Sequence, residues 1–161
     1  ILYNVPSRTS INMVPSTVAR LSSVRNIVGI KEASGSLVQV SEIIASCGPD
    51  FEVISGEDVL TWPILAIGGK GAISVTANLV PDKCAKMCRA AREGDVDKAK
   101  ELHYELLKLN DILFIETNPI PVKAALALMG RIQNEFRPPL CAPTEEHLSQ
   151  LKAVLETYEL L

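Results

Sequence analysis

Four short apolar runs recur along the first half of the chain, and each one ends in polar residues. They are rich in isoleucine and valine, start 21 to 26 residues apart, and cover residues 1–5, 27–31, 51–55 and 72–75. This spacing suits a strand, a short loop and a helix of two to three turns. Apolar runs without strict polar alternation are typical of parallel strands covered on both faces. The pattern therefore predicts four βα units.

Helical periodicity fills the segments between and after these runs. Pro15 suits the first turn of a helix, and Leu37, Val40 and Ile43 lie on one face of the next. A third, short helix near residues 59–67 is expected to be distorted by Pro63. Further helices are expected over residues 81–93, 96–115, 122–129 and 143–160. We thus expect a strand-containing region over residues 1–80 and a helical region over 81–161.

The fold class is α/β, but four parallel strands form either a small open sheet or half of an eight-stranded (β/α) barrel. The pattern alone does not separate the two. In a barrel, functional side chains lie at the carboxyl ends of several strands. Polar residues follow the four runs at that end, in segments 3–8, 31–32, 55–58 and 74–78. Their placement favours the barrel.

Composition limits the partners of the chain. Its 161 residues are 47% hydrophobic with a formal net charge of −3, which is globular and offers no basic footprint for nucleic acid. No apolar run is long enough to span a membrane. The four cysteines form no metal-ligand pair, so no metal is expected, and reduced thiols suit a cytoplasmic protein. The chain begins at Ile1 in a strand-like run, so we expect a piece of a longer polypeptide.

Lys31 is the first candidate for chemistry, because it ends a strand that is expected to be buried. Burial makes an ammonium costly, so we expect the pKa of Lys31 to be lowered and its amine to be partly neutral. A neutral lysine amine is the nucleophile that forms a Schiff base with a ketone or aldehyde. The alternative is a strand that ends and lets its lysine reach water.

Tyr3 and Arg8 strengthen this hypothesis because Tyr3 lies on the neighbouring strand and Arg8 lies just beyond it. A phenol can move protons onto and off the departing water of imine formation. A guanidinium can grip a carboxylate with two parallel hydrogen bonds. Taken singly, Tyr3 would be an edge tyrosine and Arg8 a solvated loop residue. Glu32 and the Glu57–Asp58 pair could act as acids or bases, although structural ion pairing or solvation is the favoured interpretation for them.

Four segments resemble the dihydrodipicolinate synthase family, which consists of pyruvate-dependent class I aldolases. They are YNVPSRT at residues 3–9, GIKEA at 29–33, GAISVTAN at 71–78 and NPIPVK at 118–123. The likeness runs across nearly the whole chain. It implies the second half of a (β/α)8 TIM barrel, strands five to eight, followed by the C-terminal helices of the family.

The resemblance also implies roles for individual residues. Lys31 would form the imine with pyruvate, and Tyr3 would donate and accept protons. Arg8 would bind the carboxylate of L-aspartate 4-semialdehyde. The backbone of Ile73 would line the pyruvate pocket, with Gly56 beside it. The product would be 4-hydroxy-tetrahydrodipicolinate, in lysine and diaminopimelate biosynthesis, with no metal or dissociable cofactor.

The resemblance covers only half of the family's barrel and leaves alternatives open. The first four strands of the family, with their pyruvate-binding glycine–threonine–threonine segment, are absent, so the isolated chain is expected to be inactive without the N-terminal half of the barrel. The family implies a homo-oligomer, a dimer of dimers. An N-acetylneuraminate lyase or keto-deoxy sugar acid aldolase is the alternative within the superfamily, although Arg8 favours the synthase. A non-catalytic half-barrel interaction module is the alternative from another class.

Overall fold

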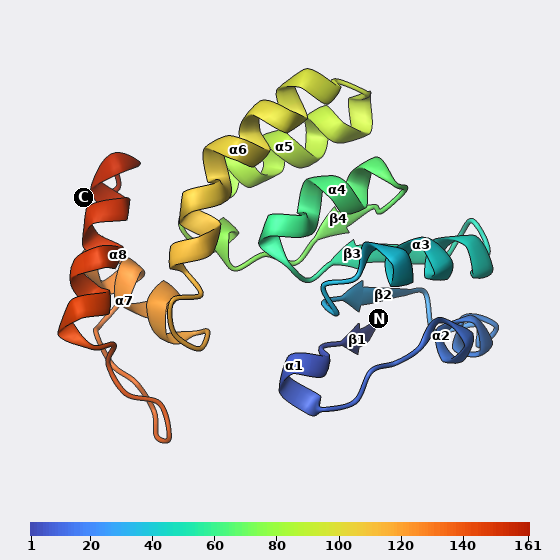
Figure 1. Ribbon diagram of the computed structural model, residues 1–161, viewed down its shortest axis with the longest axis horizontal. Helices are drawn as coiled ribbons and strands as arrows, with labels where there is room; N and C mark the ends of the chain where they lie inside the picture. The colour runs from blue at the N-terminus through green and yellow to red at the C-terminus, as the bar shows by residue number, and fades with distance from the viewer. The chain divides into compact units, whose positions relative to one another are not determined.

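A computed structural model describes residues 1–161 and contains one parallel sheet of four strands (Figure 1). The strands follow one another in the sheet as they do along the chain: β1 (Leu2–Asn4), β2 (Gly29–Glu32), β3 (Glu52–Ser55) and β4 (Gly71–Ala72). All four predicted strands are present. The predicted extent of the last one is wrong, because β4 has two residues and Val75 already caps a 3-10 turn.

The helices between the strands begin where the sequence places proline or a capping side chain. Pro15 opens α2, and the Ser36 hydroxyl accepts a hydrogen bond from the Gln39 amide at the start of α3. Within this part of the chain the helical elements are α1 (Pro6–Thr9), α2 (Pro15–Ser22), α3 (Leu37–Ser46), η1 (Asp58–Leu60), α4 (Thr61–Ala66) and η2 (Thr76–Asn78).

The rest of the chain is helical, as predicted. Its elements are α5 (Pro81–Glu93), α6 (Val96–Ile112), α7 (Ile120–Leu128) and α8 (Glu145–Thr157). The sequence places the ends of α6, α7 and α8 within three residues of these bounds. None of the helices combines the length and the apolar character that a membrane span requires.

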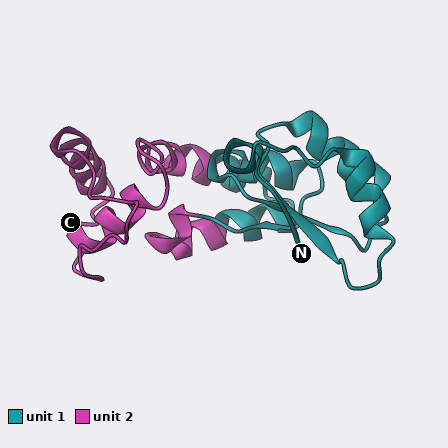
Figure 2. Ribbon diagram, turned by 90° about the horizontal axis from the view of Figure 1, so that it is seen from below, with its two compact units in different colours: residues 1–74, 87–100 teal, residues 75–86, 101–161 magenta.

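The chain divides into two compact units, which Figure 2 colours separately. The first unit consists of residues 1–74 and 87–100, and the second of residues 75–86 and 101–161. Helices α5 and α6 therefore each contribute to both units.

In the first unit, helices cover one face of the sheet. Ile30 of β2 and Val53 of β3 point toward this face and are almost fully buried. They pack with residues of α2, α3 and α4, namely Val18, Val40, Ile43 and Ile64. Because strand side chains alternate between faces, Tyr3 and Lys31 lie on the opposite face, where Tyr3 is 49% exposed. The helices of this unit thus cover one face only, not the two that the apolar runs suggested.

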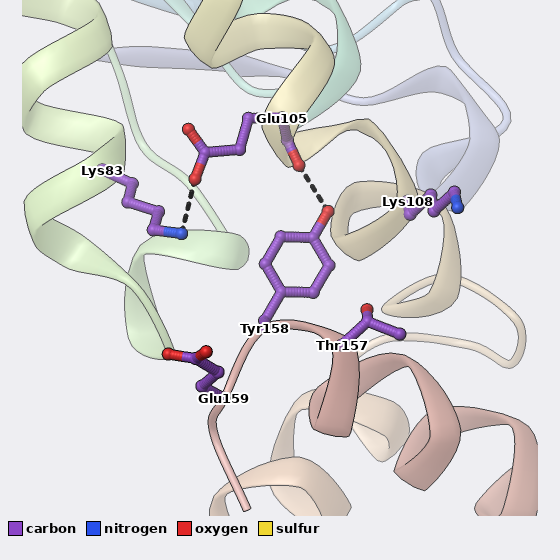
Figure 3. Close-up of a pocket in the computed structure, with 6 residues that line it drawn as sticks. All are labelled: Lys83, Glu105, Lys108, Thr157, Tyr158 and Glu159. Atoms are coloured by element: carbon purple, nitrogen blue, oxygen red, sulfur yellow. Dashed lines mark hydrogen bonds and ion pairs between the residues drawn. The ribbon is translucent and has the colours of Figure 1, made fainter.

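In the second unit, Tyr158 at the end of α8 fastens this helix to α5 and α6 (Figure 3). Its hydroxyl donates to the Glu105 carbonyl and accepts from the Leu109 amide at 3.3 Å. Lys83 of α5 lies 5.5 Å from the centre of the phenol ring and pairs with the Glu105 carboxylate at 2.5 Å. Burial is the main cause that raises the pKa of Tyr158. These side chains line a cavity where α5, α6 and the end of α8 are held together.

Candidate active site

Tyr3 and Lys31 meet on neighbouring strands. They are directly paired in the register of β1 and β2, and the Lys31 Nζ lies 4.5 Å from the centre of the Tyr3 ring. Lys31 as a whole residue is half-buried. A cation over an aromatic ring is held there by about 0.5–1 kcal/mol at such a site. The geometry therefore brings one amine and one phenol to the same face of the sheet.

Backbone hydrogen bonds keep the carboxyl ends of the strands aligned beyond the last paired residues. The Ala33 amide donates to the Asn4 carbonyl at 2.9 Å, and the Gly56 amide donates to the Glu32 carbonyl at 2.8 Å. These bonds extend the ladder from β1 to β2 and from β2 to β3. The segments that follow Lys31 and β3 are consequently fixed beside each other.

Gly56, the residue after β3, lies directly against the Lys31 side chain. A Cβ atom at position 56 would stand 2.9 Å from Lys31 Cε, 3.0 Å from Lys31 Cγ and 2.8 Å from the Cβ of Ala33. These separations are well below an ordinary carbon–carbon contact of about 3.5–4.0 Å. The absence of a side chain at Gly56 is therefore what gives the lysine stem its path.

Ile73 and Arg8 follow the other two strands at the same end of the sheet. The Ile73 amide donates to the Ser55 carbonyl at 2.9 Å, which fixes its backbone beside β3. Arg8 lies on the single turn α1, is exposed, and its backbone amide donates to the Val5 carbonyl at 2.9 Å. Tyr3 and Lys31 thus lie one residue before the ends of β1 and β2, and Gly56, Ile73 and Arg8 follow strands at the same end of the sheet. Three of these candidates, Tyr3, Lys31 and Gly56, lie together.

The interpretation of Glu32 as ion-paired or solvated is wrong. Its side chain is 1% exposed and accepts hydrogen bonds from amide N–H groups, with Asn4 Nδ2 at 3.0 Å and the Ser34 amide at 2.7 Å. Asn4 and Gln39, which belong to this cluster, were missed by the sequence reasoning. The sequence carried a signal for the burial of Glu32. Side chains two residues apart in a strand point to the same face, and Glu32 therefore shares a face with the buried Ile30.

The Glu57–Asp58 pair is not a solvated loop either. Asp58 is buried, and Oε2 of Glu57 is buried without a hydrogen-bond partner. Burial raises the pKa of Glu57, and the negative charges of Glu32 and Asp58 raise it further. The charged form of Glu57 is therefore less favourable in the folded protein than in the unfolded chain.

Sulfur and imidazole groups do not gather near this site. No group of three or more His, Cys, Asp or Glu side chains is placed to hold a metal ion. Cys47 is buried in the core of the first unit, and all four cysteines are free.

The site places an amine beside a phenol near the carboxyl ends of two parallel strands on a βα scaffold, an arrangement that suits carbonyl chemistry by a lysine. Comparison with known proteins identifies the family. The profile of the Dihydrodipicolinate synthetase family matches residues 1–158, and the chain belongs to this family.

Two relatives illustrate the degree of similarity. The 4-hydroxy-tetrahydrodipicolinate synthase of Citrifermentans bemidjiense is 51% identical over 161 residues, which is 100% of this chain and 56% of the relative. The synthase of Thermodesulfovibrio yellowstonii is 53% identical over 161 residues, 100% of this chain and 55% of the relative. The chain therefore spans about half the length of the curated relatives it matches.

Solved structures give the same result for the fold. The dihydrodipicolinate synthase of Aquifex aeolicus superposes with a TM-score of 0.96 at 45% identity, covering 98% of this chain and 54% of that one. The Thermotoga maritima enzyme superposes with a TM-score of 0.96 at 43% identity, covering 99% and 55%. These neighbours are TIM-barrel proteins, so the prediction of four βα units from such a barrel is confirmed.

Proposed function

We propose that this chain supplies the Schiff-base lysine of a pyruvate-dependent class I aldolase, a 4-hydroxy-tetrahydrodipicolinate synthase. The observation that carries the proposal is the separation of 4.5 Å between the Lys31 Nζ and the centre of the Tyr3 ring. The names of relatives about half identical to this chain support the same conclusion. The chain spans about half of their length, so the activity is proposed for the full-length polypeptide that carries it.

In the first step, the unprotonated amine of Lys31 attacks the keto carbon of pyruvate and forms a carbinolamine. The carbinolamine loses its hydroxyl group as water, and the Tyr3 phenol provides the proton that this departure needs. The imine nitrogen then withdraws electrons, so the pyruvate methyl group loses a proton and becomes an enamine. Gly56 and the backbone of Ile73 border the space in which we place pyruvate.

In the second step, the enamine carbon attacks the aldehyde carbon of L-aspartate 4-semialdehyde, whose C=O bond opens and whose oxygen takes up a proton to become the hydroxyl group of the product. Arg8 holds the carboxylate of this substrate by charge-assisted hydrogen bonds. The amino group of the adduct then attacks the imine carbon and displaces Lys31, which closes the ring to 4-hydroxy-tetrahydrodipicolinate. The imine acts as the electron sink, so these steps need no metal or dissociable cofactor.

The proposal includes the setting of the reaction. We place residues 1–80 in the second half of a (β/α)8 barrel and residues 81–161 in its last helix and the C-terminal helices. The first half of the barrel supplies the rest of the pyruvate site, and the enzyme assembles as a dimer of dimers in the cytoplasm. Isolated, the present chain would have little or no condensation activity.

Trapping with borohydride tests the proposal in the full-length polypeptide. Incubation with pyruvate and borohydride should reduce the imine to a stable adduct on the peptide that contains Lys31. Lys31→Arg keeps the positive charge, removes the nucleophile and should form no adduct. The enzyme should consume pyruvate with L-aspartate 4-semialdehyde far faster than it cleaves N-acetylneuraminate. A folded protein without an adduct would overturn the proposal, and preferred cleavage of the sugar acid would reassign the acceptor.

A further inference from the structure

A buried polar cluster lies directly behind the Tyr3–Lys31 pair. Asn4 and Glu32 follow Tyr3 and Lys31 in sequence, are themselves paired in the register of β1 and β2, and are 2% and 1% exposed. Because strand side chains alternate, they point to the helix side of the sheet. Asn4 Nδ2 donates to both oxygens of the Glu32 carboxylate, at 3.2 and 3.0 Å.

The cluster continues to the segment after α1 and to α3. Asn12 Oδ1 accepts from Asn4 Nδ2 at 2.9 Å and from Gln39 Nε2 at 3.1 Å, and Asn12 Nδ2 donates to Gln39 Oε1 at 2.8 Å. Gln39 Nε2 also lies 3.4 Å from Glu32 Oε2. These bonds join two strands, one helix and one connecting segment around a single carboxylate.

Two backbone amides fix the direction of every hydrogen bond in the cluster. The Met13 amide donates to Asn4 Oδ1 at 2.9 Å, so the amide nitrogen of Asn4 must face Glu32 and Asn12. The Ser34 amide donates to Glu32 Oε1 at 2.7 Å. Glu32 must therefore accept with both oxygens, because N–H donors approach each of them.

An isosteric amide at position 32 cannot satisfy this arrangement. Its NH₂ group would face the donors of Asn4 and Gln39. Turning the Gln39 amide around removes one conflict and creates another with Asn12. Turning Asn12 in response moves the conflict to Asn4, which the Met13 amide holds in place. Asn12 is exposed, so water can replace its own bonds, whereas the buried side chains at positions 4 and 32 depend on partners inside the protein. At least one donor of these buried groups would lose its protein acceptor, and such a group is costly to leave unpaired.

We propose that Glu32 is a positioning residue for the reaction at Lys31. Its carboxylate ties β1 to β2 one residue beyond the Tyr3–Lys31 pair and so sets the distance between the phenol and the amine. This inference rests on the proposed imine chemistry. It assigns Glu32 a role through the backbone of both strands, with no contact to substrate and no proton transfer of its own.

The test compares three variants of the full-length polypeptide. Glu32→Gln should lower kcat and the rate of borohydride trapping by about 10- to 100-fold, the loss that follows a displacement of about 1 Å. Its KM for pyruvate should change less. Glu52→Gln, at an exposed position on β3, should behave as wild type. Circular dichroism establishes that each variant is folded.

The double variant Asn4→Asp/Glu32→Gln separates positioning from chemistry. It moves the carboxylate to β1 and the amide to β2, keeps the net charge, and permits a full set of hydrogen bonds once Asn12 and Gln39 turn. The new carboxylate accepts from Met13, from Asn12 and from the new amide. This variant should recover kcat and the trapping rate to within about threefold of wild type, with an unchanged pH profile.

The outcomes distinguish this inference from the proposed function. If wild type forms no adduct, the proposed function is overturned and this inference with it. If wild type forms the adduct and Glu32→Gln forms it equally fast, only the role of Glu32 is wrong. A folded double variant that stays slow would also refute the role, because a positioning network would have been rebuilt. Should Glu32→Gln not fold, the double variant decides alone, and its own failure to fold counts against the inference.

Discussion

Replacing Gly56 by alanine tests the geometry of the site most directly. The added methyl group would lie 2.9 Å from Lys31 Cε and 2.8 Å from the Cβ of Ala33. An ordinary carbon–carbon contact needs about 3.5–4.0 Å, so the groups must separate by roughly 0.6–1.2 Å. The hydrogen bond from the Ala33 amide to the Asn4 carbonyl holds Ala33 in place, so residue 56 itself must shift away from it, and the flexible lysine stem must yield as well.

The expected loss follows from this displacement. Overpacking of this kind costs about 1–3 kcal/mol of stability. A shift of about 1 Å in a reacting atom lowers the rate by up to about 100-fold. Gly56→Ala should therefore lower the rate of imine trapping on Lys31 by up to about 100-fold. Its thermal midpoint should fall only by the amount that a loss of about 1–3 kcal/mol produces.

Borohydride trapping at several pyruvate concentrations, followed by mass spectrometry of the Lys31 peptide, measures this effect. Gly48→Ala is the matched control, because a Cβ at position 48 meets nothing within 4 Å. A Gly56→Ala protein that traps pyruvate at the wild-type rate would show that Lys31 does not use the path seen here.

Three further predictions concern side-chain groups of the two units. Tyr3→Phe should keep the fold and lower kcat by about 10²- to 10⁴-fold, because the proton donor for the departing water is lost. Glu57→Gln should raise the thermal midpoint at pH 7. The pKa of Glu57 is raised in the folded protein, so its charge opposes folding there, and the gain should fade as the pH falls below the usual glutamate range, where both states are protonated. Tyr158→Phe should lower the free energy of unfolding by about 1 kcal/mol in denaturant titrations and leave trapping on Lys31 unchanged, because it removes the hydroxyl that joins α8 to α6.

Each of these predictions has a contrary result. Wild-type turnover in Tyr3→Phe would remove the phenol from the proton path. A Glu57→Gln protein that is less stable than wild type at pH 7 would mean that its carboxylate has a favourable partner. An unchanged unfolding curve for Tyr158→Phe would show that the hydrogen bonds of this hydroxyl contribute nothing measurable to stability.

The sequence predicted the order of strands and the meeting of Tyr3 with Lys31 because both follow from local rules. Parallel strands joined by short helices place their carboxyl ends at one edge, and the neighbouring strands carry one residue each to that edge. Pro15 similarly marked the start of α2. The end of β4 was misplaced, because Val75 is apolar but adopts a helical conformation at the start of η2.

The environment of Glu32 was beyond local rules. Its partners Asn4 and Gln39 lie 28 and 7 residues away, and Asn12 joins them from a segment without regular structure. A carboxylate is normally found in water or beside a cation, so the favoured interpretation failed where amide N–H groups replaced both. Only the fold reveals which amides gather around it.

The alternation of side chains along β1 and β2 has a consequence for engineering. Tyr3 and Lys31 point to one side of the sheet, whereas Asn4 and Glu32 point to the other. In the proposed enzyme, a library that varies the side around Tyr3 and Lys31 would explore new aldehyde acceptors while the polar cluster of Asn4 and Glu32 behind it stays intact. Selection for a different acceptor can therefore change the exposed side of β1 and β2 without loss of the hydrogen bonds that hold the two strands together on the other side.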